Sequence, residues 1–432
     1  MDVVAASIPL FFLLIAVEVL VARRLREPFY RFNDSIADLS CGILSQLSGL
    51  FMILLTYGAF AWLGEHWSVY RWFDLPPWPQ GSPLVASEGA LGFVIAWPAL
   101  ASWTVVFVLA DLAYYWLHRL SHEINFLWAG HVVHHSSEEY NLTVALRQSS
   151  LHGLVSWVFY MPLAVIGIPW IMFAVCHGIN LIYQFWIHTR EIDKLGPLET
   201  VMNTPSHHRV HHGVNPKYQD RNYAGVFIVW DKLFGTFVPE EEEPVYGITI
   251  PLRTWNPIIA NIHVFQEIFR NAWRTRRWRD KLKVIFGPPS WRPDDIGPPI
   301  VAQEVSRDGF IKFDTKPPTA VTRYVAIQFV ILLLGAVVLL RSAGDLPVYQ
   351  VVAGGFYIGI GLSSLGSMLE ARRWAASLEF ARLLMLVILA VGFTVIPRFP
   401  FGIVLAVGAF AVASLGWVWR VRPALAATPQ PA

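Results

Sequence analysis

Long runs of apolar residues divide the chain into segments of the length needed to cross a membrane. A helix needs about 20 mostly apolar residues to span a hydrocarbon core of about 30 Å. Seven runs approach or exceed this length: Ser7–Ala22, Ile43–Leu63, Gly89–Leu117, Tyr324–Leu340, Leu346–Leu369, Leu383–Pro397 and Phe399–Trp419. The pattern predicts an all-α, multi-pass helical membrane protein.

One further apolar stretch is too long to be a single span. No Asp, Glu, Lys or Arg occurs between Gln148 and Thr189, and Gly167 and Pro169 interrupt the stretch near its middle. A straight helix of this length would overshoot the bilayer. We therefore expect two helices that form a hairpin with its corner at Gly-Ile-Pro.

A polar region separates the first membrane segments from the last four. It begins after Val238 with the acidic residues Glu240–Glu243 and contains prolines up to Pro318. This composition predicts a membrane catalytic domain at 1–238, a polar and partly basic interfacial connecting region at 239–320, and a C-terminal bundle of about four helices at 321–432. Within the connecting region, arginines, lysines and tryptophans alternate from Arg270 to Lys283. A helix lying on an anionic membrane surface has this composition, and so does a solvated basic helix.

Basic residues beside short loops predict the orientation of the chain. Four arginines follow the first span, so we expect that loop in the cytoplasm and the N-terminus outside. The first span is not followed by a small-residue cleavage site, which favours a retained anchor over a signal peptide. The third span then returns His118 to the cytoplasmic side. The membrane would be the cytoplasmic membrane of a bacterium or the endoplasmic reticulum of a eukaryote.

Composition agrees with a membrane protein and excludes several other classes. Hydrophobic residues make up 55% of the 432 residues and charged residues only 15%, against roughly 45–50% and about 25% in soluble chains. A net charge of +2 gives no indication of nucleic-acid binding. The two cysteines, Cys41 and Cys176, lie far apart in apolar surroundings and exclude a disulfide scaffold or a CxxC site.

The histidines carry the candidate chemistry. Twelve of the fourteen lie between His118 and His212. They form one H-x-x-x-H motif and two H-x-x-H-H motifs, made by His118, His122, His131, His134, His135, His208, His211 and His212. Residues at i, i+3 and i+4 share a helix face, and eight imidazoles suffice for two metal ions. Nitrogen ligands alone suit iron, zinc, copper or nickel.

Other residues are candidates for supporting roles. Asp111 precedes His118 by seven residues, so it either accepts the second ring N–H of a ligand histidine or pairs with the backbone or an arginine. His188 closes the hairpin at the cytoplasmic end and is expected to reach the same cluster. His152 and His177 lie in apolar runs, where we expect them either to pack or to support the ligand histidines.

The motifs resemble those of the fatty acid hydroxylase and sterol desaturase superfamily. A closer resemblance is to the tetrahydrobiopterin-dependent alkylglycerol monooxygenases. It lies in H-H-S-S-E-E-Y-N-L from His134, A-L-R-Q-S from Ala145, Y-Q-F-W-I-H-T from Tyr183, N-T-P-S-H-H-R-V-H-H-G from Asn203 and W-D-K-L-F-G-T-F from Trp230. The resemblance implies two iron ions bound by the eight motif histidines, with His188 and His207 as additional ligands. Glu138, Tyr140, Asn141, Arg147 and Asp231 fall in matched stretches without an assigned role.

The resemblance also implies an activity. A di-iron monooxygenase would use O₂ and tetrahydrobiopterin to hydroxylate a lipid C–H bond, most simply cleaving a glyceryl ether to a fatty aldehyde and glycerol. The alternative within the superfamily is a fatty acid, sterol or carotenoid hydroxylase or desaturase that takes electrons from a cytochrome or ferredoxin. A metal transporter would need ionisable groups along the spans, and a non-enzymatic lipid-binding protein would need none of the three motifs. The expected partners are a lipid substrate and membrane lipids.

Overall fold

The computed structural model describes residues 3–86, 93–301, 304–306, 309–393 and 401–427, and most of them are helical. The strands within these residues are β1 (Leu84–Ala86) and β2 (Phe93–Ile95), which pair antiparallel with Val85 opposite Val94. The predicted all-α fold is confirmed, with this short hairpin as the one addition among the described residues.

Six of the described helices are long and apolar enough to cross a membrane. They are α1 (Val3–Leu25), α2 (Phe32–Trp67, continued by α3, Val69–Phe73), α4 (Trp97–Glu123), α14 (Thr319–Ser342), α15 (Val348–Leu369) and α17 (Phe401–Ala427). A further helix, α16 (Ala375–Phe393), packs along α17. The predicted spans that end at Pro397 and begin at Phe399 reach into residues 394–400, which lie outside the described residues. The six helices fit an integral membrane protein.

Helix α2 is longer than its apolar run predicted. It begins at Phe32, eleven residues before Ile43, and its 36 residues extend about 54 Å. Two carboxylates occupy the added turns, and both are buried and paired: Asp34 lies 2.9 Å from Arg31, and Asp38 lies 3.1 Å from Arg147. Because these charges have partners inside the protein, they do not end the helix.

The predicted hairpin is present, with its corner at Gly167 and Pro169. Gly167 has a φ of +91°, which favours glycine, and Pro169 precedes α9 (Trp170–Trp186). The arm before the corner is broken into α7 (Gly153–Ser156), the 3₁₀ helix η1 (Trp157–Tyr160) and α8 (Met161–Val165). The 17 residues of α9 extend about 26 Å, short of a hydrocarbon core of about 30 Å.

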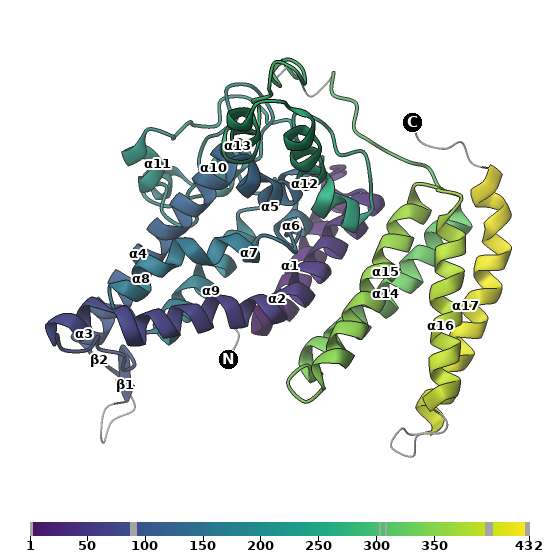
Figure 1. Ribbon diagram of the computed structural model, residues 1–432, viewed down its shortest axis with the longest axis horizontal. Coiled ribbons are helices and arrows are strands. Elements are labelled where there is room, and N and C mark those ends of the chain that lie inside the picture. The colour runs from purple at the N-terminus through teal and green to yellow at the C-terminus, as the bar shows by residue number, and fades with distance from the viewer. Residues whose placement is uncertain (1–2, 87–92, 302–303, 307–308, 394–400, 428–432) are drawn as a thin grey trace.

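Several of the shorter helices that follow α4 lie toward one edge of the molecule (Figure 1). Helix α4 leads into α5 (Asn125–His135), and beside them lie α6 (Leu142–Ala145), η2 (Gly196–Thr200), α10 (Pro205–His211), α11 (Val229–Phe234), α12 (Pro257–Arg274) and α13 (Trp278–Phe286). The C-terminal ends of α15 and α17 lie at this same edge. The compartment that this edge faces stays a prediction.

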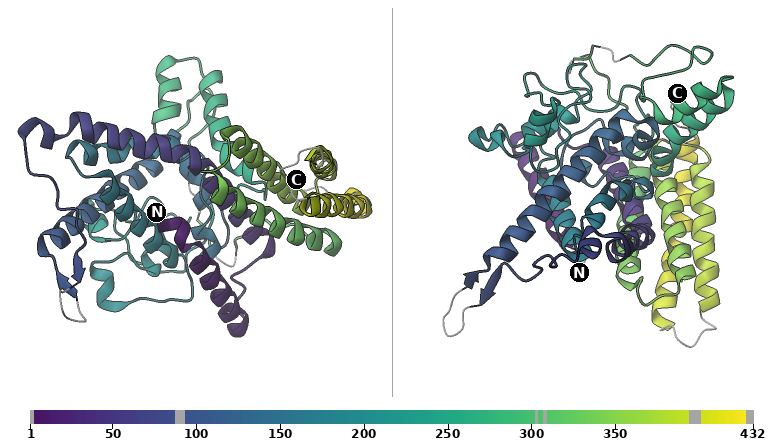
Figure 2. Two further views of the ribbon diagram at one scale, coloured as in Figure 1. Left: turned by 90° about the horizontal axis from the view of Figure 1, so that it is seen from below. Right: turned by 60° about the vertical axis from the view of Figure 1, so that its left-hand side comes forward.

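The C-terminal helices form a bundle that packs against α2. Helices α14–α17 run side by side, and α4 crosses the molecule obliquely to them (Figure 2). Their core joins Tyr324, Phe329 and Leu362 to Ile36 and Leu47 of α2. Helix α2 therefore contacts both the bundle and the histidine-bearing segments, and the predicted domain limits at 238 and 320 stay predictions.

The basic segment of the connecting region forms the end of α12 and most of α13. Trp273 and Trp278 are each 77% exposed, and Phe269 on α12 is 71% exposed. Exposed aromatic side chains among arginines are compatible with both sequence interpretations, a membrane-surface helix and a solvated one.

Candidate metal centre

Four separate segments bring histidines together. The last turns of α4 carry His118 and His122, and α5 and α10 carry the two H-x-x-H-H motifs. His188 follows α9 directly. These segments meet because α4 packs against both α5 and α9. The imidazoles are therefore held by helix ends rather than by a mobile loop.

Nine of these histidines form two buried clusters. In each cluster, one possible ligand atom from every residue lies within 4.8 Å of the others. The first cluster contains five histidines: His118, His122, His131, His135 and His211. The second contains four: His134, His188, His208 and His212. All eight motif histidines are thus brought together, and His188 joins them as expected.

Each H-x-x-H-H motif contributes to both clusters. His131 and His135, one helical turn apart, belong to the first cluster, whereas His134 between them belongs to the second. In the other motif, His208 and His212 belong to the second cluster and His211 to the first. The clusters are therefore adjacent, and the rings of His135 and His212 stack across the boundary with centroids 4.4 Å apart.

The spacing of the ring nitrogens fits a shared ion. The Nε2 atoms of His118 and His131 are 3.0 Å apart, and those of His131 and His135 are 3.1 Å apart. In the second cluster, Nε2 of His188 lies 3.2 Å from that of His134 and 3.0 Å from that of His208. Two nitrogens bound at about 2.1 Å to one ion and at right angles to each other would be about 3.0 Å apart. The donor set therefore matches a metal ion in each cluster.

The opposite ring nitrogens fix the orientation of several imidazoles. An Nδ1–H donates to a backbone carbonyl oxygen in four of them: His118 to Tyr223 (2.7 Å), His134 to Arg147 (3.1 Å), His188 to Gln184 (2.7 Å) and His211 to Arg221 (2.9 Å). This bond leaves Nε2 with its lone pair free, which is the tautomer that a metal needs. The Nε2 atoms of His122, His211 and His212 are buried without a hydrogen-bond partner, as expected of ligand atoms.

Burial lowers the pKa of several of the clustered imidazoles. Loss of water around His134 lowers the pKa of its ring to about 4. Burial, followed by the proximity of other histidines, lowers the pKa of His131, His135, His208 and His212 well below the ordinary value. Neutral nitrogen donors at neutral pH are therefore ready to bind metal without first losing a proton.

Comparisons with known proteins place the chain in a family. Residues 103–236 match the family model described as fatty acid hydroxylase. The chain is 38% identical over 397 residues to alkylglycerol monooxygenase of Homo sapiens, an alignment covering 90% of this chain and 82% of that protein. The Xenopus tropicalis alkylglycerol monooxygenase is 37% identical, with the same coverage. The chain belongs to the alkylglycerol monooxygenase family.

The family likeness extends beyond the histidine segment. The fatty acid hydroxylase model covers all nine clustered histidines. Because the alignment with the human protein covers 90% of the chain, it also includes most of the helices on either side. The ornithine lipid hydroxylase OlsE of Rhizobium tropici is 29% identical over 156 residues, 35% of this chain and 47% of that protein. No solved structure matches the chain.

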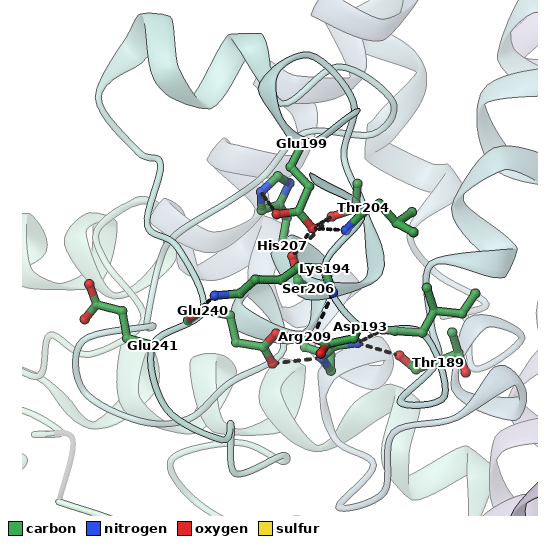
Figure 3. Close-up of polar contacts among 12 residues, drawn as sticks. Thr189, Asp193, Lys194, Glu199, Thr204, Ser206, His207, Arg209, Glu240 and Glu241 are labelled. Atoms are coloured by element: carbon green, nitrogen blue, oxygen red, sulfur yellow. Dashed lines mark hydrogen bonds and ion pairs between the residues drawn. The ribbon is translucent and has the colours of Figure 1, made fainter. Parts of the chain in front are cut away.

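His207 does not reach either cluster, although the family resemblance had suggested it as a ligand. Its Nε2 lies 3.9 Å from one carboxylate oxygen of Glu199, and the other carboxylate oxygen accepts a hydrogen bond from Ser206 (2.7 Å), as Figure 3 shows. Neighbouring histidines in a helix point about 100° apart, so His208 faces the clusters while His207 faces away. The adjacent Arg209 donates to the carbonyl oxygen of Thr189 (3.1 Å) and ties the segment after His188 to α10.

Asp111 contacts backbone rather than histidine. Its carboxylate accepts hydrogen bonds from the backbone N–H groups of Val226 and Phe227 and from the side chains of Asn180 and Trp230, at 2.6–3.0 Å. The first of the two expected roles, orientation of a ligand ring, is therefore not observed, and the alternative of backbone pairing describes the geometry. Asp111 fixes the loop that begins just after Tyr223.

Several supporting residues had no role before the structure was known. Arg147 is buried and donates through Nε to the carbonyl oxygen of Val133 (2.7 Å), which holds the end of α5. Asp231 accepts hydrogen bonds from the N–H groups of Tyr223 and Ala224, both at 2.8 Å. It thereby positions the carbonyl oxygen of Tyr223, which accepts the hydrogen bond from Nδ1–H of His118. Both residues lie in stretches that carry the family resemblance, which was the only sequence signal for them.

Two cavities open onto the histidines and share no lining residue. One, of about 580 Å³, is lined by His122, His135, His211 and His212 and by the polar connecting region. The other, of about 340 Å³, is lined by His131, His134 and His188 and by apolar side chains of the membrane helices. His152 and His177 line this second cavity, and His177 also packs against Phe173 and Tyr160, as expected of a packed residue.

Proposed function

We propose that the protein is a membrane-bound di-iron monooxygenase that cleaves glyceryl ethers. The reaction inserts one oxygen atom of O₂ into the C–H bond of the alkyl carbon next to the ether oxygen, and the other oxygen atom leaves as water. Two electrons and two protons come from a reductant, which we propose to be tetrahydrobiopterin. The resulting hemiacetal breaks its C–O bond to give a fatty aldehyde and free glycerol.

One observation carries the proposal. Two adjacent clusters of buried imidazoles lie in a chain 38% identical over 90% of its length to an enzyme named alkylglycerol monooxygenase. A lipid-binding protein or transporter has no need for nine histidines that converge at the end of α4. Iron is proposed over zinc because zinc has no redox chemistry and the reaction requires electron transfer to O₂.

The residues of the chain would bind the metal ions and orient the ligand rings. The nine histidines would bind two ions, five and four ligands respectively, and the bound ions would supply the binding and reductive activation of O₂. Backbone carbonyl groups fix four of the rings through Nδ1. We further propose that this edge of the molecule faces the cytoplasm, because the loop after α1 carries arginines.

The test combines metal analysis with product detection. The purified protein in lipid nanodiscs is analysed for metal content and then incubated under O₂ with an alkylglycerol, a free fatty acid or a sterol. Each lipid is tested with reduced tetrahydrobiopterin and, separately, with a ferredoxin and its reductase. We expect two iron ions per chain, and aldehyde and glycerol only from the alkylglycerol with the pterin.

Other outcomes would replace the proposal. Turnover of the fatty acid or sterol with ferredoxin would assign the protein to another activity of the superfamily. Hydroxylation without release of glycerol would exclude ether cleavage. Stoichiometric zinc, with no product from any lipid, would refute the monooxygenase.

A further inference from the structure

The apolar cavity beside the histidines joins two parts of the molecule that the catalytic motifs do not connect. Its inner wall includes His131 from the first cluster and His134 and His188 from the second. Its outer wall includes apolar residues of α1, α2 and α14. The cavity therefore extends from a point shared by both clusters to the first helix of the C-terminal bundle.

Helix α14 turns one continuous stripe toward this cavity. Leu333, Ala336, Val337 and Leu340 line it, and their spacing of i, i+3, i+4 and i+7 places them on one face of the helix. The stripe extends about 10 Å along the helix axis. Two turns of α14, rather than one side chain, therefore form part of the cavity wall.

The other faces of α14 have different surroundings. Leu332 and Leu339 are buried in the core of the C-terminal bundle. Leu334 and Val338, the immediate neighbours of Leu333 and Val337, are 57% and 64% exposed. The cavity stripe borders this core, because Ala336 is buried in it and Leu333 and Leu340 pack against it. Leu333 and Leu334, and likewise Val337 and Val338, are therefore pairs of identical residues of which one lines the cavity and the other faces outward.

The opposite wall comes from α1, where Phe11 and Phe12 line the cavity. The Phe11 ring stacks on Phe185 of α9 with centroids 4.1 Å apart. Both α1 and α14 are candidate membrane spans, and the lining residues lie inside those spans. The cavity is therefore at hydrocarbon depth, where its natural occupant is an apolar chain rather than a water-soluble ligand.

We propose that this cavity binds the alkyl chain of the lipid substrate, and that the 333–340 stripe of α14 sets which chain lengths are accepted. This rests on the proposed function for the chemistry, but not for the binding of the chain. A chain lying along α14 brings its polar end to His131, His134 and His188, between the two clusters. The C-terminal bundle is then part of the substrate site.

Matched tryptophan substitutions test the stripe. Val337→Trp and Leu333→Trp fill the cavity, whereas Val338→Trp and Leu334→Trp add the same bulk to the outer face. The ratio of kcat/KM for hexadecylglycerol to that for octylglycerol is measured for all four. We expect the cavity variants to lower this ratio about tenfold or more, because mismatched methylene groups in an apolar pocket have effects of that size. The outer-face variants should keep the ratio of the unmodified protein.

A smaller residue gives the complementary result. Val337→Ala enlarges the cavity without risk of overpacking, so it should raise the relative rate on longer or methyl-branched chains. Equal chain-length ratios in Val337→Trp, Val338→Trp and Val337→Ala would overturn the proposal. Metal content serves as the control for folding in every variant.

Photochemical labelling separates this proposal from the ether-cleaving activity. A hexadecylglycerol with a diazirine at the end of its chain, and a palmitic acid with the same group, are irradiated with the protein in nanodiscs. We expect labelling of Leu333, Ala336, Val337 or Leu340, displaced by excess unlabelled lipid of the same class. If neither lipid is turned over but one still labels the stripe competitively, the proposed reaction fails and the chain site stands. Labelling confined to Leu334, Val338 or other outward residues would overturn the chain site.

Discussion

Buried polar groups occur both at the histidine clusters and in the C-terminal bundle, and the two regions treat them differently. In the bundle, Arg382 donates to Glu379 (2.9 Å), Gln328 (2.9 Å) and Tyr357 (2.8 Å). Tyr324 donates to Glu379 at 2.6 Å. Every nitrogen of the Arg382 guanidinium and both carboxylate oxygens of Glu379 have a partner within the protein.

In the histidine clusters, by contrast, some buried polar atoms have no hydrogen-bond partner. The Nε2 atoms of His122, His211 and His212 are buried without a partner, although an unpaired buried polar atom costs about 1–3 kcal/mol. A folded chain tolerates several of these atoms in one place when another species completes their bonding. The comparison teaches that a satisfied buried network stabilises a helix bundle, whereas an unsatisfied one marks where a ligand binds.

The largest expected effect comes from removing a histidine from either cluster. His134→Ala and His211→Ala each remove one ligand from a different cluster, so each should lower activity by more than about 100-fold, the upper range for loss of a ligand's supporting partner. Metal content and turnover are measured together. His66→Ala, which removes an exposed histidine stacked on Trp62, should change neither, and full turnover in either cluster variant would contradict the ligand assignment.

Breaking a buried ion pair in each region sharpens the comparison. Arg147→Met leaves Asp38 without its cationic partner, and Arg382→Met does the same to Glu379. An unpaired buried charge costs about 3–5 kcal/mol. Both variants should unfold at lower denaturant concentration. Only Arg147→Met should also lose metal, because Arg147 holds the end of α5. Release of metal from the Arg382 variant would show that the two regions are not energetically distinct.

A milder effect is expected from the loop that orients His118. Asp231→Asn weakens the acceptor for the N–H groups of Tyr223 and Ala224, so we expect metal affinity to fall about 10–100-fold. Titration with a competing chelator measures it. Asp193→Asn, at an exposed position, is the matched control, and equal affinities in the two variants would count against this role of Asp231.

The smallest effect concerns the exposed basic segment. If it lies on the membrane, brominated lipids should quench Trp273 and Trp278, more strongly in anionic than in neutral nanodiscs. Reversing the charges of Arg274, Arg277 and Lys281 should remove this dependence on anionic lipid while leaving metal content unchanged. Absence of quenching in both lipids would instead identify a solvated basic helix.

The hydrophobic pattern predicted the helical fold, and the histidine spacing predicted which eight rings converge. The hydrophobic pattern missed the start of α2, because the charged residues Asp34 and Asp38 suggest that the helix begins after them. Their arginine partners become visible only in the fold. The spacing placed His208 in a motif, but it could not show whether His207, one residue earlier, also reaches a cluster, since only the direction of its side chain on α10 decides this. The partners of Asp111 were also hidden, because they lie more than 60 residues away in the sequence.

The sharing of each H-x-x-H-H motif between the clusters links the history of the two sites. A single residue inserted between His131 and His134 would turn the following rings by about 100° and disturb the second cluster through His134 and the first through His135. Deleting either H-x-x-H-H motif would therefore remove ligands from both clusters at once. Descendants of this fold are therefore expected to retain both sites or to lose both.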